Sequence, residues 1–87
     1  MAAALQVWSH TFCRHYDALP VAVQAAIQRR VDEMGQRLDS YPHHRLTGRG
    51  ECRLRVGDYR VVYEFDVAQG RISLLYVGHR RDIYKRS

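Results

Sequence analysis

Two arginines face each other across a predicted tight turn in the second half of the chain. On either side of Gly57-Asp58, polar and apolar residues alternate with a period of two, which predicts two antiparallel strands joined by a two-residue turn. This register puts Arg55 directly opposite Arg60. Like charges that face each other destabilise a sheet, so the pair predicts a bound anion such as a phosphate group. A salt bridge from Arg60 to Glu64 is the structural alternative.

The positive charge of the chain is concentrated in the same half. The 87 residues carry a formal net charge of +5; residues 1–42 hold four arginines and four acids, whereas residues 43–87 hold nine arginines and one lysine against five acids. Arg53, which the register places opposite Val62, adds a third guanidinium group to the same face. Arginine binds phosphate oxygens through two parallel hydrogen bonds, so this composition favours a nucleic-acid ligand. A genome that favours arginine codons is the alternative explanation.

A basic tail follows the last predicted strand. Residues 78–86 include Arg80 and Tyr84, so they add cations and a phenol at the end of that strand. His79 is a candidate acid or base, because an imidazole titrates near neutral pH, although a structural role is also open. Such charged runs are usually solvated termini, but Ile83 provides an apolar anchor to the core that a solvated tail does not need.

Four further segments build the fold that positions these residues. An alternating run at 4–8 predicts a strand, Ser9 then caps a first helix, and an apolar stripe predicts a second helix over 20–39. An apolar run at 71–77 predicts a well-covered strand. The expected fold is α+β, in the order β-α-α-β-β-β with a short C-terminal helical tail. A helical hairpin packs on one face of a small antiparallel sheet and leaves the other face open for the arginines.

Cysteine and histidine spacing argues against several classes of site. Cys13 and Cys52 lie far apart without a CxxC spacing, so we expect two buried thiols in a reducing compartment, with neither a disulfide nor a zinc site. His43 and His44 have no third metal ligand nearby in the sequence. The sequence shows neither a signal peptide nor a membrane-spanning segment, so residues 1–87 are expected to form a single cytoplasmic domain without a cofactor.

Two motifs resemble those of a known toxin family. Similarity to the RelE toxins of the RelE/ParE superfamily is carried by the runs 54–64 (LRVGDYRVVYE) and 77–84 (VGHRRDIY). The likeness covers nearly the whole chain, because the order of elements and the Leu-Thr-Gly loop at 46–48 are also theirs. Members of this superfamily are the small toxins of bacterial and archaeal toxin-antitoxin pairs. The resemblance therefore implies a RelE-like fold.

The resemblance implies an endoribonuclease that cuts messenger RNA in the ribosomal A site without a metal. In this family the RNA's own 2′-hydroxyl attacks, which leaves a 2′,3′-cyclic phosphate and a 5′-hydroxyl. By motif match, Arg60 contacts the scissile phosphate, Arg80 stabilises the transition state or helps the leaving oxygen, and Tyr84 orients the 2′-hydroxyl or accepts its proton. Arg53 falls where some relatives have a lysine. Glu51 departs from the pattern, because the best-known members have a second lysine there.

Further residues and partners follow from the same resemblance. Additional catalytic candidates are Arg53, Arg55 and His79. Candidates for contacts with RNA or the ribosome are Arg45, Arg49, Arg81, Lys85 and Arg86. The expected partners are a cognate RelB-like antitoxin, in a toxin-antitoxin hetero-oligomer, and messenger RNA on the ribosome with its ribosomal RNA, with no membrane partner. Two alternatives are a ParE-like toxin, which shares the fold and poisons DNA gyrase without cutting, and an inactive homologue that only binds antitoxin.

Overall fold

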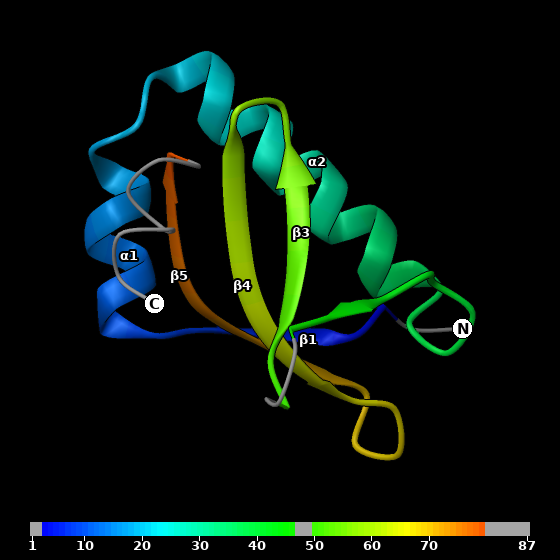
Figure 1. Ribbon diagram of the computed structural model, residues 1–87. Coiled ribbons are helices and arrows are strands. Elements are labelled where there is room, and N and C mark those ends of the chain that lie inside the picture. Colours follow the sequence, from blue (N-terminus) through cyan, green and yellow to red (C-terminus); the bar gives the residue numbers. More distant parts are fainter. Residues whose placement is uncertain (1–2, 47–49, 80–87) are drawn as a thin grey trace.

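Two helices cover one face of a five-stranded sheet in the computed structural model, which describes residues 3–46 and 50–79 (Figure 1). The helices are α1 (His10–Asp17) and α2 (Val21–Gln36). The strands are β1 (Leu5–Trp8), β2 (His44–Arg45), β3 (Cys52–Val56), β4 (Tyr59–Asp66) and β5 (Arg71–His79). The predicted α+β class, with a helical pair on one sheet face, is confirmed.

The strands follow the order β1-β5-β4-β3-β2 in a mixed sheet. Strands β2 to β5 pair antiparallel, as predicted, and Val56 lies opposite Tyr59 at the β3–β4 turn. β1 instead pairs with β5 in parallel, with Leu5 beside Arg71. The prediction of a purely antiparallel sheet is wrong at this edge. A period of two specifies the face that each side chain occupies, but not the direction of a distant partner strand.

β2 is a strand where the sequence predicts a loop. His44 lies opposite Arg53, and Arg45 lies opposite Cys52, so this short segment forms the edge of the sheet beyond β3. Two residues are too few to show an alternating pattern, and the proline and glycines around them favour a loop. The element order therefore gains one strand between the second helix and the predicted hairpin.

α1 begins at its predicted cap. Ser9 Oγ accepts a hydrogen bond from the Phe12 N–H at 2.9 Å, which satisfies one of the unpaired donors of the first helical turn. Phe12 is fully buried, and its ring meets the Trp8 ring edge-on with 4.9 Å between centroids. The cap thus fixes the start of a helix whose inner face is aromatic.

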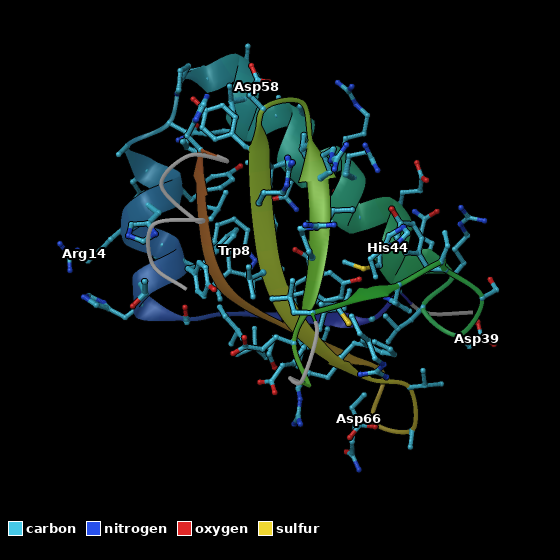
Figure 2. All side chains as sticks on the ribbon, in the orientation of Figure 1. Trp8, Arg14, Asp39, His44, Asp58 and Asp66 are labelled. Carbon is cyan, nitrogen blue, oxygen red and sulfur yellow. The ribbon has the colours of Figure 1, made fainter. Side chains whose placement is uncertain are left out.

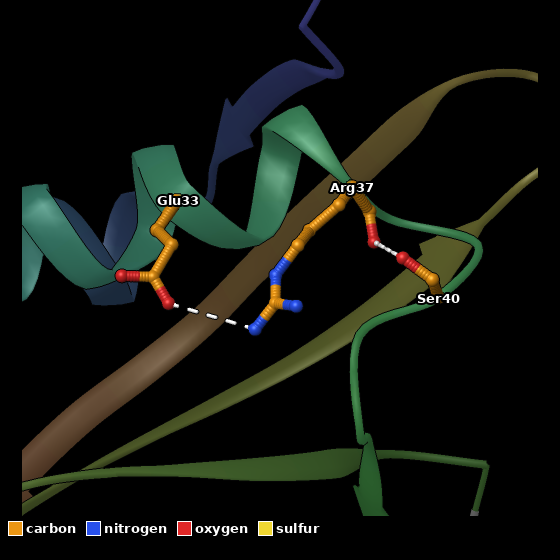
Figure 3. Close-up of polar contacts among 3 residues, drawn as sticks. All are labelled: Glu33, Arg37 and Ser40. Carbon is orange, nitrogen blue, oxygen red and sulfur yellow. Dashed lines mark hydrogen bonds and ion pairs between the residues drawn. The ribbon is translucent and has the colours of Figure 1, made fainter.

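α2 ends before its predicted boundary. Figure 3 shows this end, where Arg37 Nη2 lies 3.8 Å from Glu33 Oε1 and Ser40 Oγ donates to the Arg37 carbonyl at 3.4 Å. The Gly35 carbonyl accepts a hydrogen bond from the Ala4 N–H at 2.9 Å. The helix ends here because that carbonyl is bonded to the segment before β1 and not to a further helical turn.

The hydrophobic core lies between the helices and the sheet. Ile27, Val31 and Met34 form the predicted apolar stripe of α2, and each is at most 1% exposed. They pack in one cluster with Tyr63 and Phe12, the two largest of the fully buried side chains. Among the described residues, neither helix is long and apolar enough to cross a membrane. The core therefore uses one face of the sheet and leaves the opposite face for other contacts.

Candidate functional site

The sheet face that points away from the helices carries the predicted arginines. We call it the arginine face and define it by Arg53, Arg55, Arg60, Val62 and Tyr76. β3 and β4 pair in the predicted register, with Arg55 opposite Arg60 and Arg53 opposite Val62. β5 completes both rows, because Gly78 lies opposite Arg60 and Tyr76 lies opposite Val62. The facing arginine pair is therefore confirmed, and two rows of three residues cross the sheet.

Arg60 is the buried charged residue of this face. It is 4% exposed, and its Nε and Nη1 atoms have no hydrogen-bond partner among the described residues. The salt bridge to Glu64 is absent, since Glu64 is exposed and the ion pair of the described residues lies elsewhere. A buried polar group with unmade hydrogen bonds costs about 1–3 kcal/mol or more, and an anion beside Arg60 would offset this cost.

The arginine face is not open over its whole area, contrary to the prediction. Val62 is 1% exposed although it lies outside the core cluster of the helix side. Its neighbours across the sheet, Arg53 and Tyr76, are long side chains and are themselves half-buried. Arg55, next to the turn, is exposed. The face therefore combines a covered centre with an arginine that solvent and ligands can reach.

A β-bulge at Leu75 brings Tyr76 to the arginine face. The pairing of β5 with β4 skips Leu75, so strict alternation is interrupted and Tyr76 lies opposite Val62. Ser9 holds the bulge, because its N–H donates to the Leu74 carbonyl at 3.0 Å and its hydroxyl donates to the Leu75 carbonyl at 2.6 Å. The sequence predicts no role for Tyr76 in the site, because a regular strand would turn its side chain toward the core.

The same bulge turns His79 away from the arginines. His79 lies opposite Tyr59, and the two rings meet edge-on with 5.6 Å between centroids. Because Tyr59 and Arg60 are consecutive in one strand, their side chains point to opposite faces. The candidate acid or base His79 is therefore on the helix side of the sheet and not beside Arg60.

Ser9→Ala is expected to lower the free energy of unfolding by about 1–2 kcal/mol, because the hydroxyl both caps α1 and holds the bulge. Urea denaturation of the parent and the variant measures this change. Ser40→Ala is the control, since it removes an exposed contact of 3.4 Å, and it is expected to change stability by less than about 0.5 kcal/mol. Equal effects of the two substitutions would contradict the role assigned to Ser9.

β2 adds His44 to the arginine side and turns Arg45 to the other side. Figure 2 labels His44 at this edge of the sheet, where it lies opposite Arg53 and shares its face. Arg45 lies opposite Cys52 on the helix side, with its guanidinium carbon 5.3 Å from the centroid of the Phe65 ring. The RNA contact predicted for Arg45 would thus fall on the face opposite the arginines. His44, which received no role from sequence, takes a place beside them.

His43 is part of the structural support beneath the site. Its Nε2–H donates to the Leu38 carbonyl at 2.8 Å, and its Nδ1 accepts from the Tyr63 hydroxyl at 2.6 Å. Its ring stacks on the Phe65 ring with 3.7 Å between centroids. Burial raises the pKa of the Tyr63 phenol and of the Cys52 thiol, so both groups stay neutral at pH 7. These groups fix β3 and β4 from the core side.

Several predicted site residues lie outside the described residues. They are Arg49, Arg80, Arg81, Tyr84, Lys85 and Arg86. The roles proposed for them, and the helical tail, stay predictions. The described part of the site supplies the guanidinium groups predicted to bind an anion, while the proton transfer predicted for Tyr84 belongs to the tail.

The fold is that of the RelE-type toxins. A chain of the RelBE2 toxin-antitoxin complex from Mycobacterium tuberculosis is similar with a TM-score of 0.75 and 23% identity, over 92% of this chain and 94% of that chain. A chain of the RelB-RelE complex from Methanococcus jannaschii gives 0.74 and 23%, over 92% and 96%. The isolated E. coli RelE toxin gives 0.76 and 13%, over 97% and 98%. At these identities the likeness establishes the fold.

The sequence itself establishes the family. The profile of the ParE toxin of type II toxin-antitoxin systems (parDE) matches residues 7–84. The chain belongs to this family of toxins, within the RelE/ParE superfamily. No curated protein sequence matches the chain. The resemblance drawn from the two motifs is therefore confirmed for the superfamily, while the profile is that of the ParE branch and the similar structures are of the RelE branch.

Proposed function

We propose that this toxin is a ribosome-dependent endoribonuclease that cuts messenger RNA in the A site. One observation carries the proposal: Arg60 is 4% exposed on the arginine face, opposite Arg55, with two nitrogen atoms lacking hydrogen-bond partners among the described residues. A surface that only binds another protein does not require a buried and unsatisfied cation. Stabilising the charge that develops on a phosphoryl group does require such a preorganised donor.

The proposed reaction takes place within one RNA strand. The 2′-oxygen loses its proton and attacks the adjacent phosphorus, the bond to the 5′-oxygen breaks, and that oxygen takes up a proton. Negative charge grows on the non-bridging oxygens, where Arg60 and the neighbouring Arg55 stabilise it. By resemblance, Arg80 adds to this stabilisation and Tyr84 orients the 2′-hydroxyl or accepts its proton. The attacking group belongs to the substrate, so the protein supplies positioning and charge.

Purified toxin added to ribosomes that carry a defined messenger is expected to cut it in the A-site codon and to leave 5′-hydroxyl and 2′,3′-cyclic phosphate ends. Primer extension locates the cut, and mass spectrometry of the fragments identifies both ends. A messenger with 2′-deoxynucleotides in the A-site codon is the control, because it lacks the attacking group and should stay intact. If the all-ribose messenger also stays intact, the nuclease proposal fails.

The second candidate function is inhibition of DNA gyrase, as in the ParE branch of the superfamily. The profile match over residues 7–84 favours it, since the matching family is the ParE toxin of parDE. In that case the arginine face would contact a protein or its DNA without cutting anything. A supercoiling assay with purified gyrase separates the two functions: inhibition together with intact messenger on ribosomes would favour the gyrase target.

We also propose that a cognate antitoxin binds this toxin in a cytoplasmic hetero-oligomer. Two of the similar structures are a RelBE2 toxin-antitoxin complex and a RelB-RelE complex. An antitoxin with acidic residues over the arginine face would supply an anion for Arg60 and exclude RNA from it. Mixing the toxin with the product of the adjacent gene should raise its melting temperature, because a ligand that binds only the folded chain stabilises it. An unchanged melting temperature would argue against that gene product as the partner.

A further inference from the structure

A cavity of about 390 Å³ lies at the β3 side of the sheet, beside the arginine face; we call it the edge cavity. Residues from three parts of the chain line it, namely Arg30 of α2, Tyr41 and His44 around the start of β2, and Arg53 and Arg55 of β3. Its volume lies within the range of about 300–1,000 Å³ that is typical of ligand sites. Three guanidinium groups around one cavity make it a site for an anion.

The arginines of the edge cavity have no anionic partner within the described part of the chain. There, the ion pair at the end of α2 joins Arg37 to Glu33 (Figure 3). Arg37 also lies over the Tyr41 ring, with its guanidinium carbon 5.3 Å from the ring centroid. Arg30, two turns earlier on the same helix, makes neither kind of contact there. Like charges that converge from a helix and a strand repel each other, so their arrangement favours an anion between them.

We propose that the edge cavity binds a second backbone phosphate of the RNA, adjacent to the phosphate that is cut at Arg60. This inference rests on the proposed nuclease function. Arg55 joins the two sites, because it lies opposite Arg60 and also lines the edge cavity. A strand whose scissile phosphate is held at Arg60 can therefore place a neighbouring phosphate between Arg30 and Arg53. Such a second contact fixes the position of the strand relative to the reacting atoms.

Two aromatic rings in the edge cavity suit a nucleotide better than free phosphate. Tyr41 is half-buried and His44 is exposed, and both line the same cavity as the arginines. Bases of single-stranded RNA stack on such rings while arginines hold the backbone. Free phosphate would use the arginines alone. The expected ligand is therefore a single-stranded RNA segment, with its phosphate on the guanidinium groups and a base on a ring.

Fluorescence anisotropy with a 2′-O-methyl RNA hexamer tests this proposal, because the probe cannot be cut and reports binding alone. Arg30→Ala is expected to weaken binding about 10-fold and to reduce the slope of log K against log salt by about 0.7, the value for one phosphate contact on a single strand. Arg30→Lys is expected to lie between the parent and Arg30→Ala, since lysine keeps the charge and loses the planar fork. Melting temperatures of both variants verify folding.

Arg29→Ala is the matched control. Arg29 is exposed on α2 and does not line the edge cavity. Arg29→Ala removes the same charge as Arg30→Ala, so the affinity of this variant for the hexamer should differ from that of the parent by less than about 2-fold. Equal losses for Arg29→Ala and Arg30→Ala would overturn the proposal, as would an unchanged affinity of Arg30→Ala or a parent protein that does not bind the hexamer. If the expected losses appear while messenger on ribosomes stays intact, the nuclease proposal fails and the RNA-binding cavity stands.

Discussion

Arg60→Met is expected to slow messenger cleavage by at least about 100-fold and, at the same time, to raise the free energy of unfolding by about 1–2 kcal/mol. The rate falls because the variant lacks a donor to the charge of the transition state. Stability rises because methionine fills a site that is 4% exposed and leaves no nitrogen there without a partner. Cleavage on programmed ribosomes and urea denaturation measure the two effects.

Arg71→Met provides the control for the Arg60 substitution. It removes the same charge at an exposed position of β5, opposite Asp66 in the neighbouring strand. We expect no gain in stability there and a change in rate of less than about 3-fold, because no buried donor is lost. Arg60→Lys separates charge from geometry, since lysine keeps a cation without the planar fork and should recover only part of the rate. A loss of both rate and stability in Arg60→Met would mean that Arg60 holds the fold together, and its assignment to the site would fail.

The facing arginines could be predicted from sequence because every feature that places them is local. Gly57 adopts φ +59, a left-handed conformation that glycine enters without strain, and the two-residue turn it forms fixes the register of both strands. Once Val56 lies opposite Tyr59, Arg55 must lie opposite Arg60. Alternation then gives the face of each side chain, and the stripe of α2 shows which face is the core.

The remainder of the site depends on contacts between distant segments. One bulge turns Tyr76 to the arginine face and His79 away from it. Ser9 holds this bulge, because its hydroxyl donates to the carbonyl of Leu75, which lies 66 residues further along the chain. No local pattern at 71–79 predicts that contact, and the sequence of this segment predicts a regular strand. The burial of Arg60 is equally hidden, because alternation assigns a face without telling how well that face is covered.

The edge cavity illustrates the same limit. Arg30 lies on α2 outside the apolar stripe, so the sequence predicts only a charged residue on the exposed side of the helix. It lines one cavity with Arg53 and Arg55 because α2 packs against β3 and β2 lies at the edge of the sheet. A helix and two strands that are unrelated in sequence thus contribute to one cavity. The proposed RNA contact therefore depends on tertiary placement more than on any single motif.

His43→Ala is expected to lower the free energy of unfolding by about 3 kcal/mol. The substitution removes the acceptor of the Tyr63 hydroxyl and the donor to the Leu38 carbonyl, at 2.6 and 2.8 Å, together with the stack on Phe65. Tyr63 is 0% exposed, so its hydroxyl would lose the His43 ring as a hydrogen-bond partner inside the core. Urea denaturation followed by circular dichroism measures the loss.

Two further variants show whether the lost hydrogen bond of the Tyr63 hydroxyl is the source of that loss. His44→Ala, at the neighbouring exposed residue, shares none of these contacts and should change stability by less than about 0.5 kcal/mol. Tyr63→Phe combined with His43→Ala should recover about 1 kcal/mol relative to His43→Ala alone, because the buried hydroxyl that lost its bond to His43 is then absent. If the losses of His43→Ala and Tyr63→Phe simply add in the double variant, the effect of His43→Ala comes instead from the lost ring stack. The coupling measures the interaction energy of His43 with Tyr63, which β4 carries on its core side in the same strand as Arg60.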